Sequence, residues 1–408
     1  MSTARTTRRI MSGMLAVGLV AASVYAAAAL LTPVPAWTLE QTIDVPDAEG
    51  VAAQLALPTA GSTAVVVGSA PPVLAGSAAA RPIAGAAKLV LVNVVLDAEP
   101  LELGQPGTAL SIDQSHVARY RELNAAGART VPVTFGETWT RRDLLQATLL
   151  ASGNNTAELL IDEVFGGLPQ YLEAASAWLS ELGLDDTVVA DGSGLDADSR
   201  STALDLARLT AMTLANPVLA DLVERRPLDT SAGVRLVDEA SFVPSTGALG
   251  LVRSYTDAAG VCIVLAVPVG DRLAAGVVLG QPGYPSAEDA VRALVDSLSS
   301  TAQAVEVVSA GQRVAVVSTD WGQEVALLAD AAVSVDLWSL ESTELQVRVP
   351  PRSTVIAGTD VGSLTVISDP LDGGTEQVVR VRADGTITEP GVAWRFADPV
   401  TVLQRWTG

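Results

Sequence analysis

The sequence predicts an α+β fold followed by a small all-β domain. Up to about residue 300, helical patterns are interleaved with short apolar strands, whereas the chain from Ala304 onward consists of short apolar runs separated by Gly, Pro or Asp. Of the 408 residues, 49% are hydrophobic and 17% are charged. This composition excludes a disordered polyelectrolyte, and the length allows two or three domains with a buried core.

The first 35 residues predict a membrane anchor or a signal segment. Three arginines precede an uncharged stretch from Ile10 to Leu31, whose length at about 1.5 Å per residue spans the ~30 Å hydrocarbon layer. The flanking positive charge predicts a cytoplasmic N-terminus, with the bulk of the chain beyond the membrane. Ala26, Ala27 and Ala28 also resemble a cleavage site for a removed signal peptide, and the length of the stretch favours the anchor over this alternative.

The following segments predict the elements of the first domain. Residues 36–55 form an expected linker, and residues 56–300 form the domain itself. The expected strands are Ser62–Val67, a strand beginning at Pro72, Cys262–Val267 and Leu273–Leu279. The expected helices are Ile83–Asp97, Asp143–Phe165, Pro169–Leu182, Ser201–Asn216 and Ser286–Leu298, the last capped by Ser286.

Residues 301–408 predict the all-β domain. It contains seven short runs with turn residues between them, and no fixed-period repeat that would indicate a solenoid. The runs are Val305–Val308, Arg313–Val317, Glu324–Leu328, Val333–Leu337, Glu344–Val349, Ser363–Ile367 and Glu376–Val381.

The charged residues restrict the possible chemistry. The net charge of -21 gives no basic surface for nucleic acid, so we expect no nucleic-acid partner. One cysteine, Cys262, and one histidine, His116, exclude a disulfide framework and a Cys/His zinc site, and we expect neither a metal nor a cofactor. Lys88 is the one lysine of the chain, so any chemistry that needs a deprotonated amine falls to it.

Three local sequences stand out in chain order. The first is Arg81-Pro-Ile-Ala-Gly85-Ala-Ala-Lys88, which opens a buried helix. The second is Ser152-Gly-Asn154-Asn155, at a break between helices. The third is Val252-Arg253-Ser254-Tyr-Thr-Asp-Ala-Ala-Gly260, which leads into a strand.

Their order and spacing resemble the serine D-alanyl-D-alanine carboxypeptidases, the low-molecular-mass penicillin-binding proteins, whose motifs Ser-x-x-Lys, Ser-x-Asn and Lys-Thr-Gly are shared with serine β-lactamases. The resemblance covers about residues 50–300 and includes Gly136-Glu137, Asp191-Gly-Ser193-Gly-Leu195 and Thr256-Asp-Ala-Ala-Gly260. The segment Ile356 to Val366 also looks like the C-terminal domain of that family. The resemblance implies a transpeptidase-like domain, with a mostly antiparallel sheet between helices and a helical subdomain.

The resemblance also implies a cleft in which lysine activates a serine nucleophile, the second motif relays a proton, and the third motif binds a terminal carboxylate. Here Gly85 stands where the nucleophile is expected, and Val252-Arg253-Ser254 replaces Lys-Thr-Gly. Arg253 is expected to face away from the cleft, because neighbouring side chains of a strand point to opposite faces.

We also considered whether residues elsewhere in the sequence replace the altered motifs. Ser245-Thr246-Gly247 is a second candidate for the third motif and also lacks the lysine. Ser77 has no helical spacing to Lys88, so it does not replace the nucleophile.

These residues favour an extracytoplasmic, catalytically inactive relative that binds peptidoglycan stem peptide or an envelope partner protein. The alternatives are an active serine-type carboxypeptidase and a scaffold whose cleft is vestigial. The remnant cleft positions are Gly85, Lys88, Ser152, Asn154, Val252, Arg253 and Ser254. Lys88 and Ser152 also have structural interpretations, as a satisfied buried amine and a tight turn. His116 and Cys262 are expected to be a surface loop residue and a core residue, respectively.

Overall fold

The computed structural model describes residues 2–46, 54–224, 229–240, 248–369 and 374–397. The chain forms two compact units. The mixed unit comprises Asp47–Ala304 and Asp336–Ser342, and the β unit comprises Met1–Pro46, Val305–Val335 and Thr343–Gly408. Each unit is described separately.

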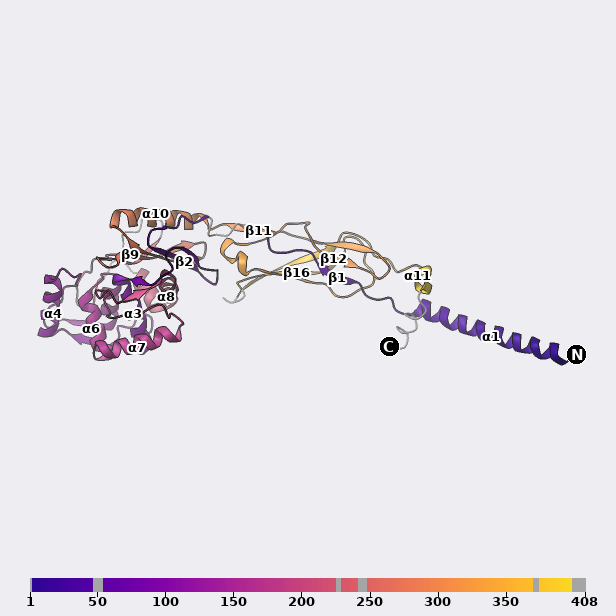
Figure 1. Cartoon of the computed structure of the whole chain (residues 1–408), viewed down its shortest axis with the longest axis horizontal. Coiled ribbons are helices and arrows are strands. Elements are labelled where there is room, and N and C mark those ends of the chain that lie inside the picture. The colour runs from indigo at the N-terminus through magenta and orange to yellow at the C-terminus, as the bar shows by residue number, and fades with distance from the viewer. Residues whose placement is uncertain (1, 47–53, 225–228, 241–247, 370–373, 398–408) are drawn as a thin grey trace. The chain divides into compact units, whose positions relative to one another are not determined.

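The mixed unit is built on an antiparallel sheet of five strands with helices on both faces (Figure 1). The order across the sheet is β3 (Val73–Gly76), β2 (Ser62–Val67), β10 (Arg272–Gln281), β9 (Gly260–Val269) and β8 (Leu249–Thr256). The α+β class and the antiparallel sheet predicted from the sequence are therefore confirmed.

Strand β9 shows why both faces of this sheet are covered. Its side chains alternate between two apolar clusters, as the two-residue period of a strand requires. Val261, Ile263 and Leu265 lie in the cluster that includes α10 (Tyr284–Ser300), whereas Cys262 and Val264 lie in the larger cluster with the remaining helices.

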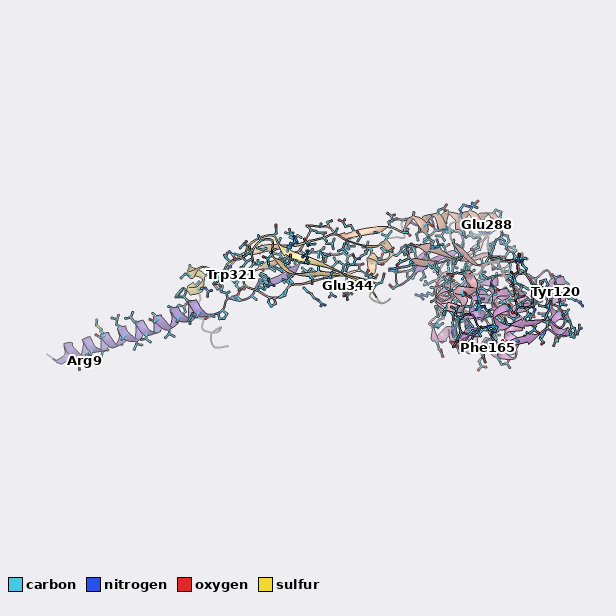
Figure 2. All side chains as sticks on the ribbon, turned by 180° about the vertical axis from the view of Figure 1, so that it is seen from behind. Arg9, Tyr120, Phe165, Glu288, Trp321 and Glu344 are labelled. Carbon is cyan, nitrogen blue, oxygen red and sulfur yellow. The ribbon has the colours of Figure 1, made fainter. Side chains whose placement is uncertain are left out.

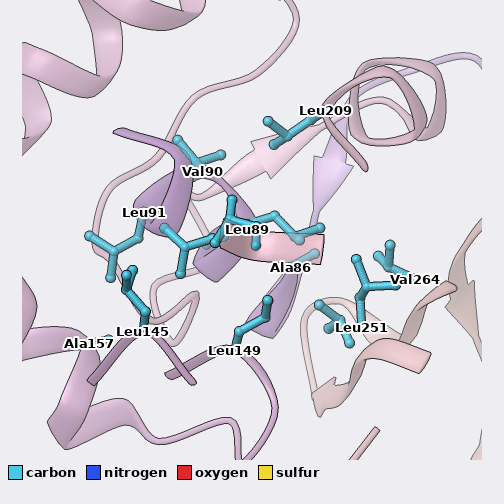
Figure 3. Close-up of a cluster of buried hydrophobic side chains, with 14 of the residues drawn as sticks. Ala86, Leu89, Val90, Leu91, Leu145, Leu149, Ala157, Leu209, Leu251 and Val264 are labelled. Carbon is cyan, nitrogen blue, oxygen red and sulfur yellow. The ribbon is translucent and has the colours of Figure 1, made fainter. Parts of the chain in front are cut away.

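Helix α3 (Ala87–Ala98) is the centre of the larger cluster. Its residues from Ala87 to Leu96 are all buried, which matches a sequence that is apolar on every side. Figure 3 shows Leu89 and Leu91 of α3 among side chains of the surrounding helices and strands. The short 3-10 turn η1 (Ala84–Ala86) leads directly into α3, so the first motif is held rigidly in the core.

The other helices of the mixed unit surround α3 or flank it. They are α4 (Gln114–Ala125), α5 (Arg141–Leu149), α6 (Asn154–Phe165), α7 (Leu168–Glu181), α8 (Ala203–Ala215) and α9 (Pro217–Glu224). Two small ladders, β4 (Arg81–Pro82) with β7 (Arg200–Ser201) and β5 (Ala109–Ser111) with β6 (Thr138–Thr140), complete the described part.

The β unit contains an antiparallel sheet of six strands in the order β1 (Thr38–Gln41), β12 (Arg313–Ser318), β13 (Glu324–Ala329), β17 (Thr375–Ala383), β16 (Asp360–Ser368) and β15 (Glu344–Arg348). Strands β11 (Ala304–Val308) and β14 (Val333–Asp336) pair separately. The unit also holds the N-terminal helix α1 (Ser2–Leu31) and the short helix α11 (Val392–Ala397). Arg9–Leu31 is long and apolar enough to cross a membrane.

The structure corrects the expected linker. Residues 38–41 form an edge strand, because Leu39 and Glu40 pair with Val317 and Val316 of β12. The isolated sequence gives little sign of this strand, because it is short and exposed and gains its stability from the ladder hydrogen bonds. Residues 47–53 of the expected linker lie outside the described residues.

The C-terminal boundary also differs from the expected division at residue 301. Residues 336–342 belong to the mixed unit. Trp338, which is 2% exposed, packs in the cluster with α10, and its Nε1 donates a 2.9 Å hydrogen bond to Thr301 Oγ1. The large side chain of Trp338 therefore anchors residues 336–342 in the apolar cluster of the mixed unit.

Two local expectations were wrong. Ser286 is not the cap of α10: the helix begins at Tyr284, and Ser286 Oγ donates to the carbonyl of the cap residue Gly283. His116 lies in the first turn of α4 instead of a loop, where its Nδ1 accepts a hydrogen bond from the backbone N–H of Asp113. A histidine can complete a capping box in this way, although Glu or Gln is the usual residue.

Candidate functional site

Most of the predicted cleft residues meet around one small cavity of the mixed unit. Its volume is about 190 Å³. Five of the predicted positions line it, namely Gly85, Lys88, Ser152, Asn154 and Ser254. The other two, Val252 and Arg253, are not among its lining residues. The three motifs, far apart in the sequence, therefore converge on one site.

Gly85 on η1 and Ser254 on β8 lie in direct contact in this site. Ser254 Oγ accepts a 3.0 Å hydrogen bond from the backbone N–H of Gly85. A Cβ atom on Gly85 would lie 3.0 Å from Ser254 Cβ, 3.2 Å from its Oγ and 3.5 Å from Lys88 Nζ. The hydroxymethyl group of Ser254 thus fills the space that a side chain at position 85 would need.

Lys88 is buried in the first turn of α3, three residues after Gly85. The residue is 3% exposed, and its Nζ donates a 2.8 Å hydrogen bond to the carbonyl of Ser193. Burial lowers the pKa of Lys88 to about 7; the charge of Asp191 opposes this shift, and that of Arg129 adds to it. The amine is consequently divided between its charged and neutral forms near neutral pH.

The loop that holds the Lys88 acceptor is organised by Asp191. This carboxylate accepts hydrogen bonds from the backbone N–H groups of Ser193, Gly194 and Asp196. Gly194 is required here, because a Cβ at this position would collide with the carbonyl of Ala84. The Asp191 loop therefore packs directly on the turn that carries Gly85.

The second motif occupies the connection between α5 and α6. Asn154 is the first residue of α6 and is 4% exposed, and its backbone N–H donates to the carbonyl of Arg129 at 3.0 Å. Within the described part of the chain, its side-chain Oδ1 is buried and accepts no hydrogen bond. Because a buried carbonyl oxygen normally has a donor, this atom is available for an N–H group of a ligand.

Asn155, next in sequence, has a structural role. Its side-chain amide pairs with both backbone groups of Val131, at 2.9 Å from the N–H and 2.8 Å to the carbonyl. The two asparagines of the motif therefore have different roles. Asn155 fixes the loop, and Asn154 faces the cavity.

Two non-glycine residues of the site have backbone strain. Ala84 has φ of 44° and Ser152 has φ of 53°, in the left-handed region that L-residues rarely adopt. Such conformations cost about 1–3 kcal/mol each and persist where the surrounding fold imposes them. The surrounding fold thus holds strained backbone at both the first and the second motif.

The third motif has lost its cation, and another residue brings one to the cavity. Val252 is 4% exposed and packs in the apolar core. Arg253 points toward α10, where Nη2 lies 2.7 Å from Glu288 Oε1 and the guanidinium stacks on Tyr284, as strand alternation predicts. Arg129 lines the cavity, with Nη1 donating to the carbonyl of Arg253 at 3.0 Å.

Arg129 is partly neutralised from its outer side. Its Nη2 lies 3.3 Å from Glu239 Oε2, and both side chains are about one-third exposed. The pair is therefore open to water and contributes little to stability. A guanidinium held in this position can also offer a donor to a carboxylate that enters the cavity.

A comparison with protein families identifies the family to which the chain belongs. The family described as D-alanyl-D-alanine carboxypeptidase matches residues 54–283. The chain belongs to this family. The match contains all three motifs and ends at the start of α10, so the sequence-based recognition is confirmed.

Individual members of the family are similar over the same region. The chain is 27% identical to the D-alanyl-D-alanine endopeptidase of Escherichia coli over 221 residues, which cover 52% of this chain and 68% of the relative. It is 30% identical to the D-alanyl-D-alanine carboxypeptidase DacB2 of Mycobacterium tuberculosis over 200 residues, which cover 47% and 64%.

Solved structures of family members share the fold. A D-alanyl-D-alanine carboxypeptidase from Mycobacterium tuberculosis is 26% identical, with a TM-score of 0.50 over 63% of this chain and 93% of that one. Penicillin binding protein 6B from Escherichia coli is 19% identical, with a TM-score of 0.57 over 83% of this chain and 99% of that one. The transpeptidase-like fold is therefore shown.

Two residues of the cavity have contacts that the sequence did not predict. Ser254 was named as a remnant cleft position, but its hydrogen bond with the Gly85 N–H was not predicted, and Arg129 was not singled out. No local pattern marks either, because Arg129 lies in the connection between α4 and β6 and acts through a contact across the fold. The one hint in the sequence was that the third motif gains a serine, Ser254, where the first motif has Gly85 in place of the expected serine.

The remaining candidates lie elsewhere. Ser77 lines a separate cavity near α8 and not the one that holds Lys88. Ser245, Thr246 and Gly247 lie outside the described residues. Cys262 is fully buried in β9, and burial raises the pKa of its thiol to about 11, so it is a core residue as expected.

Proposed function

We propose that this chain is an extracytoplasmic member of the family that binds a peptidoglycan stem peptide without forming an acyl-enzyme. The resemblance places the nucleophile at position 85, and Gly85 has no hydroxyl group to acylate. The observation that carries the proposal is the hydrogen bond from the Gly85 N–H to Ser254 Oγ at 3.0 Å. In the family, the N–H at this position stabilises the oxyanion, and here it already has an acceptor.

The same cavity retains groups that suit a carboxyl-terminated peptide. Arg129 supplies a cation that the altered third motif lacks, and Asn154 Oδ1 supplies an unpaired acceptor for a peptide N–H. Lys88 supplies a buried amine that can donate in its charged form. These groups support recognition of a ligand, with acylation no longer part of the function.

The N-terminal helix supports a place in the cell envelope. Arg9–Leu31 is long and apolar enough to span a bilayer, and the arginines before it favour a cytoplasmic N-terminus. The proposal therefore includes a single membrane pass with the mixed unit and the β unit on the outer side.

Two measurements on the full chain in detergent test the proposal. Incubation with a fluorescent penicillin followed by intact mass analysis should show no adduct. Calorimetric titration with a pentapeptide ending in D-Ala-D-Ala should show binding, and the same peptide with an amidated C-terminus should bind at least tenfold more weakly. Absence of heat with millimolar peptide favours the scaffold function instead.

A second candidate function rests on Ser254 itself. Its hydroxyl lines the same cavity as Lys88, so an active enzyme with a relocated nucleophile is the specific alternative. A penicilloyl adduct that maps to Ser254 and disappears in Ser254→Ala would establish that alternative and refute the non-acylating function.

A further inference from the structure

The C-terminal end of α1 differs from the rest of the helix because the β unit covers it. The large apolar residues between Ile10 and Val24 are 50–70% exposed, whereas Ala28, Ala29 and Thr32 are at most 7% exposed. The boundary falls at Tyr25. The helix is thus free along its apolar length and integrated into the folded unit at its end.

Arg395 of α11 binds the last turn of α1. Its Nη1 donates hydrogen bonds of 3.2 Å to the carbonyl oxygens of Leu30 and Thr32, and its Nη2 lies 3.0 Å from Glu389 Oε2. The last carbonyl groups of a helix have no partner within it and carry partial negative charge. A guanidinium held there by its own carboxylate therefore stabilises the end of α1.

Aromatic residues surround the same junction. Tyr25 packs edge-on against Phe396 with ring centroids 5.6 Å apart, and its hydroxyl donates to the Phe396 carbonyl at 3.0 Å. Trp321, in the turn between β12 and β13, packs against Trp394 of α11 at 5.6 Å. Figure 2 shows Trp321 at the end of the β unit where α1 begins its free length.

The chain leaving α1 is also fixed. Within six residues of Thr32 it enters β1, which pairs along its length with β12, and β12 leads into the turn that carries Trp321. Trp37, just before β1, is 5% exposed, and its backbone N–H donates to the carbonyl of Arg352. The helix, the edge strand and α11 therefore form one continuous structure with no free tether.

We propose that α1 is retained in the mature protein and that the aromatic residues Tyr25, Trp321, Trp394 and Phe396, together with Arg395, form a collar at the outer lipid headgroups. Trp and Tyr favour this interface, since one part of the ring system is apolar and another is polar. From Ile10 to Ala27 the helix measures roughly 27 Å, close to the ~30 Å hydrocarbon layer, which places Tyr25 near its edge. The collar seats the β unit on the bilayer surface.

This inference rests on the proposed outer location of both units and excludes the cleaved-signal alternative. The small residues Ala26, Ala27 and Ala28 are inside a continuous helix, and Ala28 is fully buried. Cleavage there would also remove Tyr25 from Phe396.

The first test is the mass of the full chain extracted from bacterial membranes. The protein should contain residues of α1 upstream of Ala26, and a mature species that begins after Ala28 overturns the proposal. This outcome is independent of peptide binding, because a cleaved protein could still bind stem peptide and a retained helix does not require it.

The second test locates the collar. The full chain is placed in lipid nanodiscs whose acyl chains are brominated near the headgroups, and tryptophan quenching is measured. The Trp321→Phe/Trp394→Phe variant should lose at least half of the quenching, whereas the matched Trp139→Phe variant, which changes a fully buried residue of the mixed unit, should lose none. Equal quenching in the wild type and the double variant overturns the collar.

Discussion

Ser254 Cβ lies 3.0 Å from the point where a side chain on Gly85 would begin, and Ser254 Oγ accepts the Gly85 N–H at 3.0 Å. The cleft therefore has a hydroxymethyl group at position 254 on β8 and none at position 85 on η1. The two positions are complementary in volume, because either one can hold the group and both together cannot without displacement. Positions 85 and 254 are thus coupled by packing.

This complementarity predicts the outcome of restoring the nucleophile. Gly85→Ser alone should lower the unfolding free energy by about 1–3 kcal/mol, since the added Cβ would lie only 3.0 Å from Ser254 Cβ and one of the two groups would have to shift. Ser254→Gly in the same chain should recover most of this loss. Urea unfolding of the four proteins in the double-mutant cycle measures the coupling, which we expect to be about 1–2 kcal/mol and favourable.

Gly85→Ala serves as the matched control for this cycle, because it adds the Cβ without the hydroxyl. It should show the same destabilisation and the same rescue by Ser254→Gly. Additive effects of the two substitutions would show that the positions do not compete for space. Neither Gly85→Ser nor the double variant should regain useful D-alanine release, because Val252 still replaces the motif cation.

The sequence predicted the fold where local patterns and packing agree. The buried helix after Gly85, the strands around Cys262 and the runs of the β unit all carry strong periodicity and turn signals, and each is present. The edge strand Thr38–Gln41 and the return of Trp338 to the first core carry no such signal. They are fixed by partners far along the chain, which a local pattern does not contain.

In the site, too, residues marked by a sequence pattern were predicted, and those placed by distant contacts were not. Gly85, Lys88 and Asn154 were found because family spacing marks them, whereas Arg129 was missed. Its role depends on a contact with the carbonyl of Arg253, 124 positions away in the chain. Such contacts across the fold require coordinates.

Arg129 gives a prediction for ligand binding. Arg129→Gln should weaken binding of a D-Ala-D-Ala pentapeptide by about tenfold or more, because a charge-assisted hydrogen bond to a carboxylate contributes about 1.5–3 kcal/mol. Calorimetry measures the loss. Glu239→Gln, which removes the outer partner of the guanidinium, should instead strengthen or preserve binding. Equal affinity in the wild type and Arg129→Gln would place the carboxylate elsewhere.

Arg141 and Glu163 give a prediction for stability without an effect on the site. Their side chains are 6% and 8% exposed, with Arg141 Nη2 2.6 Å from Glu163 Oε1. Glu163→Gln should lower the unfolding free energy by about 3 kcal/mol, because it removes the buried countercharge of Arg141 and leaves the guanidinium only the exposed carboxylate of Glu99, 3.6 Å away. The exposed pair of Arg119 and Glu122 is the control, and Glu122→Gln should cost less than about 1 kcal/mol. Thermal denaturation compares them, and peptide affinity should stay unchanged in both.

Lys88 gives a prediction for pH dependence. Its pKa is lowered from 10.5 to about 7 by burial, so between these values the unfolded chain holds a proton that the folded chain has released. Stability then rises with pH, because the unfolded state binds more protons. From pH 7 to pH 8.5 the wild type should gain about 1–2 kcal/mol in the free energy of unfolding of the mixed unit, and Lys88→Met should lose this gain.

The upper limit of pH 8.5 separates Lys88 from two groups with the opposite sign. Burial raises the pKa of Cys262 from 9.0 to about 11 and also raises that of Tyr171, so both oppose folding only in more alkaline solution. Urea midpoints at pH 7.0, 7.75 and 8.5 therefore report mainly the lysine. If Lys88→Met kept the full slope of the wild type, the buried amine would not be the titrating group, and an ammonium permanently charged through its bond to the Ser193 carbonyl would take its place in the cleft.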